Sequence, residues 1–346
     1  MTVSLEHFLE TWCGSHPLRA AVAGTVTEIA ATGRAVWSLA QEPKAPPSDP
    51  VHTVINADGD RQTELDVLAD RMFLAAARRA PVAFYASEEL AEPRFIEPTR
   101  PLALAIDPLD GSSNVELNLS FGTIFAILPA LASDGPEPYA TFLQPGRCQL
   151  AAGLLIYGPQ LTLVLSVGEG THVFQNSARA GGFVLFKSPA QISALAFEFA
   201  INASNYRHWD DSIRLYFDDC VKGVRGPRAR DFNMRWLASL VVETYRILMR
   251  GGVFLYPADK RAGYGRGRLR LLYEANPVAF IVEQAGGAAS NGIDAILSLT
   301  PESLHQRVPL IFGSKREVAK LTRYHTDPSA IGERSPLFAE RGLFRA

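Results

Sequence analysis

The feature that most constrains the fold is a series of short apolar runs in the first half of the chain. Glycine, proline or acidic residues bound most of these runs, which is typical of buried strands. The runs cover residues 82–86, 102–106, 119–128, 161–167 and 183–186. Two stretches with apolar residues at helical spacing precede them, at residues 17–40 and 62–79. This order of elements predicts helices packed on a sheet.

A turn-rich break at residues 188–193 separates this part from a second one. The second part contains a predicted strand, a long predicted helix and another helix, at residues 195–201, 234–250 and 276–287. Strands mixed with helices on both sides of the break predict an α/β fold, an α+β layered sandwich of two stacked α/β domains. We expect the domains to cover residues 1–193 and 194–346.

Composition disfavours several classes of protein. Of the 346 residues, 47% are hydrophobic and 20% are charged, an ordinary globular balance. The formal net charge of -2 gives no electrostatic reason to expect a nucleic-acid or membrane partner. No stretch has the ~18 consecutive apolar residues of a membrane helix, and no signal peptide follows Met1, so we expect a cytoplasmic location. Cys13, Cys148 and Cys220 form no CxxC pair, which disfavours a thiolate zinc site.

The most informative segment is DPLDGSSN, residues 107–114, directly after the apolar run 102–106. A buried strand here delivers Asp107 and Asp110, three residues apart, and Pro108 stiffens the turn between them. Carboxylates, together with the carbonyl of Leu109, are the oxygen ligands that magnesium prefers. Gly111, Ser112 and Ser113 offer N–H and hydroxyl groups to a phosphate. The alternative is an ordinary Asp-Gly turn.

Other acidic residues stand at the ends of predicted elements. Glu88 and Glu89 follow the apolar run 82–86, and strand ends of α/β sheets are where ligands gather. Asp60 and Asp66 lie at the start of a predicted helix, where the helix dipole alone would favour a carboxylate. Glu274 ends another apolar run. The alternatives for these acids are a solvated loop and first-turn helix residues.

Together these segments resemble class I fructose-1,6-bisphosphatase, within the lithium-sensitive metal-dependent phosphatase superfamily. The resemblance covers nearly the whole chain and includes DPLDGSSN, SFGTIFAI, LQPGR, GGVFLYPA and LRLLYEANP. Inositol-type relatives in that superfamily usually carry DPIDGT, so Ser112 and Ser113 discriminate between the two groups. The resemblance implies two stacked α/β domains of the sugar phosphatase type, the first carrying most of the metal ligands and the second binding the sugar phosphate.

The resemblance also implies a role for each acidic residue. Two or three Mg²⁺ ions, with Mn²⁺ or Zn²⁺ as substitutes, would be held by side chains and by one carbonyl, namely Glu88, Asp107, Leu109, Asp110, Glu274 and Asp60. Asp60, Asp66 and Glu89 would form the catalytic set that activates the attacking water. Metal ions at such a site stabilise both the incoming and the departing oxygen.

Substrate contacts are implied on both sides of the expected boundary. They are Asp110, Gly111, Ser112, Ser113, Asn202, Tyr206, Arg235, Trp236, Tyr256, Arg268 and Arg270. Arg235 matches an arginine that in this family reaches the second phosphate of a neighbouring subunit's substrate. Two positions depart from the family pattern: Arg268 stands where lysine is usual, and Trp236 stands where a tyrosine donates its hydroxyl. The alternatives are a strand-end turn for Asn202, a core aromatic for Tyr256 and a helix-start charge for Arg235.

The resulting expectation is a fructose-1,6-bisphosphate 1-phosphohydrolase that yields fructose 6-phosphate, in gluconeogenesis or the Calvin cycle. The alternatives are a sedoheptulose-1,7-bisphosphatase, a dual-specificity bisphosphatase and, more remotely, a non-catalytic sugar-phosphate sensor. We expect a homo-oligomer, a tetramer, with no nucleic-acid or membrane partner. The AMP-binding loop of the animal enzyme is replaced by residues 14–18, and its Lys-Tyr pair by Pro101 and Leu102. The sequence therefore predicts that AMP does not inhibit.

Overall fold

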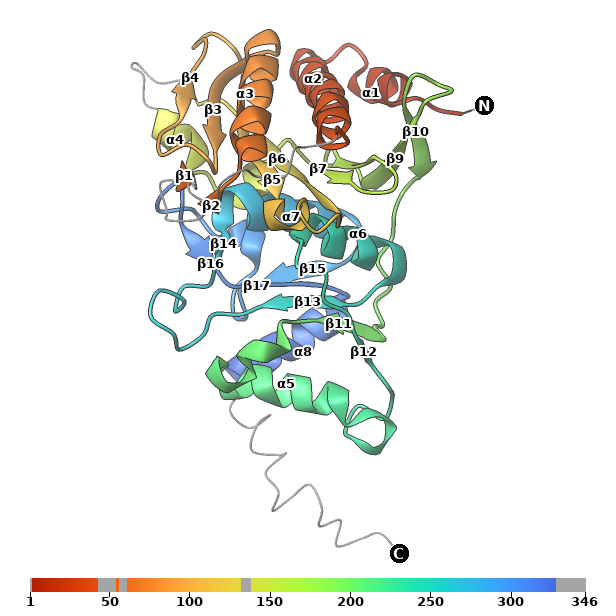
Figure 1. The fold of residues 1–346 in the computed structure, drawn as a ribbon, viewed down its shortest axis with the longest axis vertical. Helices are drawn as coiled ribbons and strands as arrows, with labels where there is room; N and C mark the ends of the chain where they lie inside the picture. Colours follow the sequence, from red (N-terminus) through yellow and green to blue (C-terminus); the bar gives the residue numbers. More distant parts are fainter. Residues whose placement is uncertain (1, 43–53, 56–60, 132–137, 328–346) are drawn as a thin grey trace, which may run out of the picture.

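The computed structural model describes residues 2–42, 54–55, 61–131 and 138–327, which stack in five layers (Figure 1). From one end of the molecule to the other, these are helices, a sheet, helices, a second sheet and helices. Three hydrophobic clusters fill the spaces between successive layers. The α/β fold predicted as a layered sandwich is confirmed.

Three N-terminal helices form the first layer: α1 (Leu5–Cys13), α2 (Pro17–Ala40) and α3 (Glu64–Arg79). They cover one face of an eight-stranded sheet (Figure 1). Apolar residues one turn apart on α2, such as Val22, Val26 and Ile29, are buried against it. Gly33 permits this close approach, because a Cβ there would lie 2.4 Å from the side chain of Leu155.

The eight-stranded sheet has the order β10-β9-β8-β7-β6-β5-β3-β4. Its strands are β3 (Val82–Ser87), β4 (Arg94–Phe95), β5 (Leu102–Asp110), β6 (Phe121–Pro129), β7 (Ala151–Tyr157), β8 (Thr162–Ser166), β9 (Thr171–Ser177) and β10 (Gly182–Lys187). Neighbouring strands pair antiparallel, except that β3 and β5 pair parallel. The strands β3 and β5, which lead into Glu88 and Asp107, therefore run in the same direction, and their C-terminal ends lie side by side.

The middle layer consists of α6 (Leu240–Arg250) and α7 (Asn276–Gln284). These helices lie between the two sheets, so apolar residues of all three layers share one core. Ile124 and Leu154 of the first sheet, Ile281 of α7 and Phe312 of the second sheet belong to it. Fully burying one such side chain contributes about 1.5–3 kcal/mol, so this core is strongly favoured.

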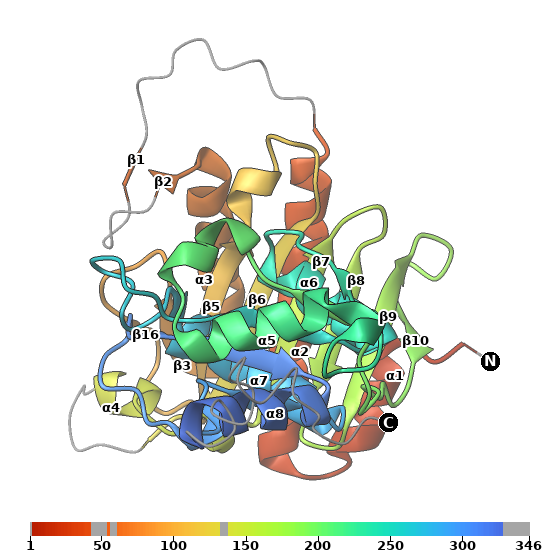
Figure 2. The ribbon, with the colours of Figure 1, turned by 90° about the horizontal axis from the view of Figure 1, so that it is seen from below.

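The second sheet has the order β12-β11-β13-β17-β15. Its strands are β11 (Glu198–Ala200), β12 (Asn233–Met234), β13 (Val253–Tyr256), β15 (Ala288–Ser290) and β17 (Leu310–Gly313). Two helices, α5 (Asp211–Val221) and α8 (Lys315–Thr326), lie side by side over its outer face (Figure 2). The remaining elements are β1 (Val54–Ile55), β2 (Arg61–Gln62), α4 (Pro138–Phe142), β14 (Leu269–Arg270) and β16 (Arg307–Val308).

Some sequence-based expectations about elements were wrong. The helix expected from residue 234 begins at Leu240, because β12 and an irregular segment come first. Ala238 in that segment has a φ of 53°, which no helix accepts. The strands β7 and β9 were not predicted, although β7 is buried along its whole length.

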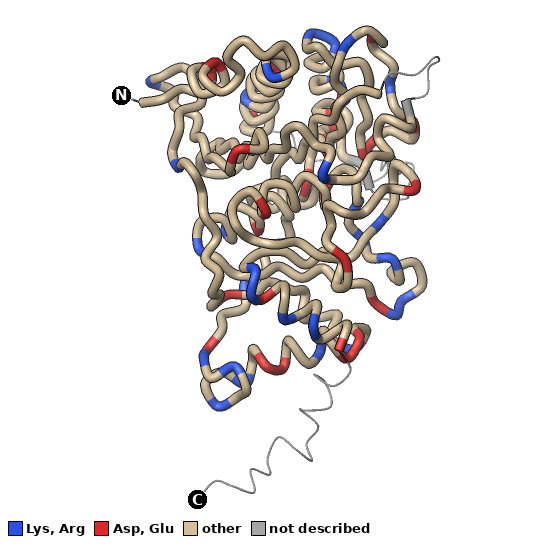
Figure 3. Tube along the Cα trace, turned by 180° about the vertical axis from the view of Figure 1, so that it is seen from behind, with Lys and Arg blue, Asp and Glu red and all other residues tan. Residues whose placement is uncertain are grey.

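Charges are dispersed over the fold. Figure 3 shows acidic and basic residues interspersed along the described trace. Within the described residues, no helix is both long and apolar enough to cross a membrane.

Candidate active site

The ends of two parallel strands bring the first two acids together. β3 and β5 lie side by side, with Ser87 opposite Ile106. Glu88, the residue after β3, donates its backbone N–H to the carbonyl of Ile106 at 3.0 Å. Asp107 is the next residue of β5. The strand register therefore places Glu88 beside Asp107.

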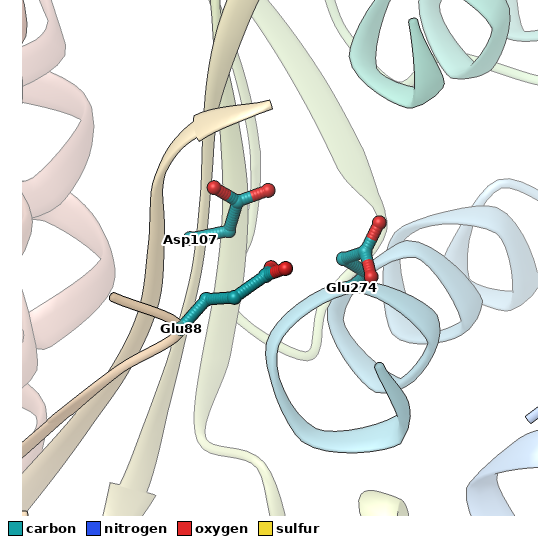
Figure 4. A group of neighbouring side chains, drawn as sticks. All are labelled: Glu88, Asp107 and Glu274. Carbon is teal, nitrogen blue, oxygen red and sulfur yellow. The ribbon is translucent and has the colours of Figure 1, made fainter. Parts of the chain in front are cut away.

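A third acid reaches this edge from the other half of the chain. Glu274 lies in a π-helical turn, Leu271–Ala275, directly before α7. Such turns are rare and occur frequently at functional sites. Carboxylate oxygens of Glu88, Asp107 and Glu274 all lie within 4.8 Å of one another. Figure 4 shows these side chains, which we call the three-carboxylate group, converging on a shared space.

Burial and mutual repulsion make this arrangement costly without a cation. Burial raises the pKa of Asp107 well above its usual value, and the Glu88 charge raises it further. Burial likewise raises the pKa of Glu274, with Glu88 again adding to the shift. Arg270 Nε lies 3.8 Å from Glu88 Oε1, but one guanidinium balances only one carboxylate. Buried donors that are all oxygen fit a hard divalent cation such as Mg²⁺.

Asp110 makes hydrogen bonds to the start of α6, and its charge also raises the pKa of Asp107 and of Glu274. Its Oδ2 accepts from the Ser239 hydroxyl at 2.8 Å and from the N–H of Val241 at 3.0 Å. Both donors belong to the N-terminus of α6, where backbone N–H groups and the helix dipole favour a negative charge. Burial raises the pKa of Asp110, and these hydrogen bonds oppose the rise. The role of Asp110 as a metal ligand remains a prediction.

The turn after Asp110 is tight and lies against the start of α6. Gly111 has a φ of 74°, and a Cβ there would lie 3.2 Å from the Ser239 side chain. Ser112 and Ser113 open a short 3₁₀ turn, and Asn114 fixes it by donating to the carbonyl of Ser120 at 3.1 Å. Ser113 is exposed. The turn packs against the start of α6, so the two halves of the chain meet here.

Leu109 and Asp107 are linked by the same turn. The N–H of Leu109 donates to Asp107 Oδ1 at 3.0 Å, which orients that carboxylate. Metal binding by the Leu109 carbonyl remains a prediction.

The predicted catalytic acids have different local roles. Asp66 is almost fully buried in the first turn of α3, where it accepts from the N–H of Thr63 and completes a capping box. The contacts of Asp66 are therefore those of a carboxylate at a helix start, the alternative named for it above, and its catalytic role stays a prediction. The backbone N–H of Glu89 donates to the hydroxyl of Ser87 at 3.2 Å. Asp60 lies outside the described residues.

A small hollow in the second half collects three of the predicted substrate residues. Asn202, Trp236 and Tyr256 all line it. Trp236 stacks on Phe254 with ring centroids 5.8 Å apart and planes 8° from parallel. Arg268 lies beside Tyr256 and lowers the pKa of its hydroxyl, although burial outweighs this and leaves that pKa raised.

The structure places the other substrate candidates outside this hollow's lining. Tyr206 is directed toward α5, where its hydroxyl donates to the Asp218 carboxylate at 3.1 Å. Arg235 is half-exposed and lies beside Glu198. Arg270 is buried next to Glu88, as part of the acidic site itself.

Comparison with known proteins decides the family. Residues 51–188 match the family described as "Fructose-1-6-bisphosphatase, N-terminal domain", and residues 192–326 match its C-terminal domain. The "Fructose-1,6-bisphosphatase class 1" of Rhizobium meliloti is 63% identical over 295 residues, 85% of this chain and 84% of that protein. The chain belongs to the fructose-1,6-bisphosphatase family.

Other members of the fructose-1,6-bisphosphatase family agree over nearly the full length. The class 1 protein of Azorhizobium caulinodans is 50% identical over 93% of this chain and 99% of that protein. The crystal structure of Leishmania major fructose-1,6-bisphosphatase in holo form has a TM-score of 0.83 and 29% identity. It covers 94% of this chain and 99% of that chain. The layered fold described above is therefore the fold of this family.

Sequence reasoning missed three residues around this fructose-1,6-bisphosphatase site. Ser239, which bonds Asp110, comes just before α6, but the helix was expected to begin earlier. Glu198 and Arg246 form an ion pair at 2.8 Å behind Arg235. One signal was available: Glu198 is an acid inside the apolar run 195–201, and a buried acid needs a partner.

Proposed function

We propose that this chain hydrolyses the 1-phosphate of fructose 1,6-bisphosphate, giving fructose 6-phosphate and phosphate. The observation that carries the proposal is the three-carboxylate group at the junction of the two halves. Family membership and the tight turn at residues 111–114, which follows Asp110, support it. A phosphatase of this kind needs a concentrated positive charge at the reacting phosphate, and a buried cluster of acids is how a protein holds one.

The cofactor that fits this site is Mg²⁺, two or three ions per site, with Mn²⁺ or Zn²⁺ as substitutes. Glu88, Asp107 and Glu274 would hold them, and the Leu109 carbonyl, Asp110 and Asp60 would complete the set. When bound, the ions neutralise phosphate charge and lower the pKa of water. The N–H groups of residues 111–113 would orient the phosphate, and Asp66 and Glu89, with Asp60, would accept the proton of the attacking water.

The second phosphate would bind in the second half of the chain. The support is the hollow lined by Asn202, Trp236 and Tyr256, with Arg268 next to it. Tyr206, Arg235 and Arg270 are the other candidates for substrate contacts. We propose accordingly that residues 1–193 form the metal-binding domain and residues 194–346 the sugar-phosphate-binding domain.

We further propose a homo-oligomer, a tetramer in the cytoplasm, in which Arg235 serves a neighbouring subunit's site. Exposed apolar side chains surround the segment that carries Arg235 and support this proposal. They are Leu195, Phe197, Met234 and Leu237, each at least 40% exposed. Water-exposed apolar side chains gathered near a charged anchor are typical of protein interfaces.

The decisive experiment measures phosphate release in Mg²⁺ from a panel of sugar phosphates. The panel contains fructose 1,6-bisphosphate, fructose 1-phosphate, sedoheptulose 1,7-bisphosphate and inositol monophosphate. We expect the highest kcat/KM with fructose 1,6-bisphosphate, and inhibition by millimolar Li⁺ as in the lithium-sensitive superfamily. A preference for the sedoheptulose substrate would change the assigned substrate. Tight binding of the sugar bisphosphate without any phosphate release would instead identify a sensor.

A further inference from the structure

Arg235 lies at the end of a buried charge network. It stands between β12 and α6, and its side chain is 54% exposed. Its Nε lies 3.8 Å from Oε1 of Glu198, a residue of β11. This separation is an ion pair without a close hydrogen bond, so the pair restrains the guanidinium while leaving its N–H groups able to donate elsewhere.

Glu198 is shared by three guanidinium groups. Its side chain is only 8% exposed; Oε2 accepts from Arg246 at 2.8 Å, and Oε1 accepts from Arg250 at 2.7 Å. Arg235 is the third. A carboxylate inside a sheet needs such partners, because its desolvation is otherwise costly. One partner would suffice for charge balance, so the arrangement has more positive charge than burial of Glu198 requires.

The network also fixes the backbone that carries Arg235. Arg246 Nε donates to Glu243 Oε2 at 2.9 Å, and Glu243 Oε1 accepts the N–H of Leu237 at 2.8 Å. At the other end of this segment, the N–H of Arg235 donates to the carbonyl of Phe199, the residue after Glu198, at 2.8 Å. The segment 235–237 is therefore held at both ends by β11 and α6.

We infer that Glu198 is a positioning residue that orients Arg235 toward the second phosphate of the substrate. It thereby sets the preference for bisphosphates over monophosphates. The inference rests on the proposed function and names a determinant of substrate specificity at that same site. Glu198 and Glu243 face three arginines, which leaves one positive charge in excess to attract a phosphate. A long, exposed arginine loses rotamer freedom on binding, and the ion pair with Glu198 removes part of that freedom beforehand.

The sign of one kinetic change distinguishes positioning from simple charge. If Glu198 only diluted the positive potential, Glu198→Gln would strengthen bisphosphate binding and lower KM. If Glu198 positions Arg235, the same variant raises KM for fructose 1,6-bisphosphate by about three- to tenfold, the scale of coupling between contacting residues. The kcat then stays within about twofold, since the reacting phosphate is untouched. For fructose 1-phosphate, which lacks the second phosphate, KM stays unchanged.

A double-mutant cycle locates the effect on Arg235. Glu198→Gln introduced into an Arg235→Ala protein is expected to cause no further rise in KM. A fully additive effect would overturn the inference, as would equal losses on both substrates. The matched control is Arg250→Met, which removes another partner of Glu198 Oε1 but leaves the ion pair between Glu198 and Arg235. For this variant, KM for fructose 1,6-bisphosphate is expected to stay within about twofold of the wild-type value.

Folding of the variants is checked by thermal unfolding and by size-exclusion chromatography. Glu243 still balances Arg246 in Glu198→Gln, so we expect a folded protein. If it does not fold, Glu198→Asp keeps the charge, shortens the side chain and is expected to raise the bisphosphate KM in the same selective way. Failure of the proposed function has a different signature, because wild-type protein would then not release phosphate from fructose 1,6-bisphosphate. A selective loss in Arg235→Ala without one in either Glu198 variant would overturn the positioning role alone.

Discussion

Glu88 illustrates how one residue connects the fold to the proposed chemistry. Its backbone bond to Ile106 places it beside Asp107, and its charge raises the pKa of both Asp107 and Glu274. Its Oε1 also lies 3.8 Å from Nε of the buried Arg270. The charge of Glu88 therefore acts on both of the other carboxylates of the three-carboxylate group and on Arg270.

We predict that Glu88→Gln lowers kcat by orders of magnitude while the fold stays intact. The amide removes ligand charge, and loss of one metal-binding carboxylate weakens the stabilisation on which hydrolysis depends. Wild-type protein should also unfold at a higher temperature when Mg²⁺ is added, because an ion that binds only the folded state stabilises it. Glu88→Gln should lose most of that shift.

The matched control for Glu88→Gln is Glu92→Gln, since Glu92 is an exposed acid a few residues further along the chain. It should leave both activity and the Mg²⁺ shift unchanged. Near-normal turnover of Glu88→Gln at saturating Mg²⁺ would contradict the assignment of the site.

Residue types were easier to predict from the sequence than side-chain directions. Asp107 and Glu88 could be found because each follows an apolar run, and neighbouring strands end at one edge. The direction of Asp110 could not, because it depends on Ser239 and Val241, which lie more than a hundred positions away in the sequence. Such contacts between distant segments are set by packing of the layers, and no local pattern encodes them.

At the scale of elements, α5 and α8 are joined by an ion pair across their ends. His325 Nε2, in the last turn of α8, lies 3.4 Å from Oδ2 of Asp210, the N-cap of α5. Burial lowers the pKa of His325, but the Asp210 carboxylate and the Leu321 carbonyl outweigh this and leave it raised. Burial opposes the shift of Asp210 as well, yet hydrogen bonds from His325 and Ile213 leave its pKa lowered.

This pair predicts a pH-dependent stability. Because the folded state raises the pKa of His325, its contribution is complete below about pH 6.5 and is lost as pH rises through the folded pKa. The contribution of Asp210 is lost only below about pH 4. His325→Gln should therefore lower the unfolding temperature more at pH 5.5 than at pH 8.5. The effect on unfolding free energy should be about 1 kcal/mol or less, since Asp210 is partly exposed.

Thermal unfolding at the two pH values tests this prediction, with His7→Gln as the control because the His7 side chain is exposed. An equal loss of stability at both pH values would mean that His325 contributes by packing and not by charge.

The turn between α1 and α2 bears on regulation by AMP. Arg19, in the first turns of α2, donates to the carbonyl of Trp12 at 3.1 Å and pairs with Glu169 at 2.7 Å. Leu102, at the position of a nucleotide-binding residue in animal relatives, is fully buried in β5. We predict that AMP does not inhibit at physiological concentrations. An AMP titration at subsaturating substrate measures this, and strong inhibition would reveal a nucleotide site elsewhere.

Whole elements were predicted where the local pattern is strong, and missed where packing decides. The helix α2 carries a regular apolar stripe and was found nearly in full. The start of α6 was misplaced because Trp236 and Leu237 continue the apolar pattern, while hydrogen bonds from Arg235 and Leu237 to Phe199 and Glu243 keep the segment extended.

At the scale of the whole molecule, different layers supply the two parts of the proposed substrate site. The three-carboxylate group stands where the first sheet meets the π turn before α7, and Arg235 stands beside the edge strand β12 of the second sheet. Exposed apolar residues flank Arg235. The family resemblance suggests that Arg235 serves a neighbouring subunit's site, and these exposed apolar residues support that proposal.

Subunit mixing tests that assignment. Arg235→Ala should raise KM for a bisphosphate roughly ten- to a hundredfold, the contribution of a charge-assisted hydrogen bond to phosphate. Asp107→Asn should be inactive alone. If the arginine acts across the interface, mixed oligomers of the two variants should regain activity at hybrid sites that contain both Asp107 and Arg235. No recovery in oligomers verified to be mixed would place Arg235 within its own subunit's site, or outside any site.

The position of Glu274 in the chain has a consequence for synthesis. Asp107 and Glu88 leave the ribosome early, but Glu274 follows 167 residues after Asp107. At about 5–20 residues per second, this interval lasts roughly ten to thirty seconds. During that time the nascent chain carries two carboxylates of the group and cannot complete it. The group is therefore completed only after the π-helical turn that carries Glu274 has been made and docked, so a chain that stalls before Glu274 lacks one of its three carboxylates.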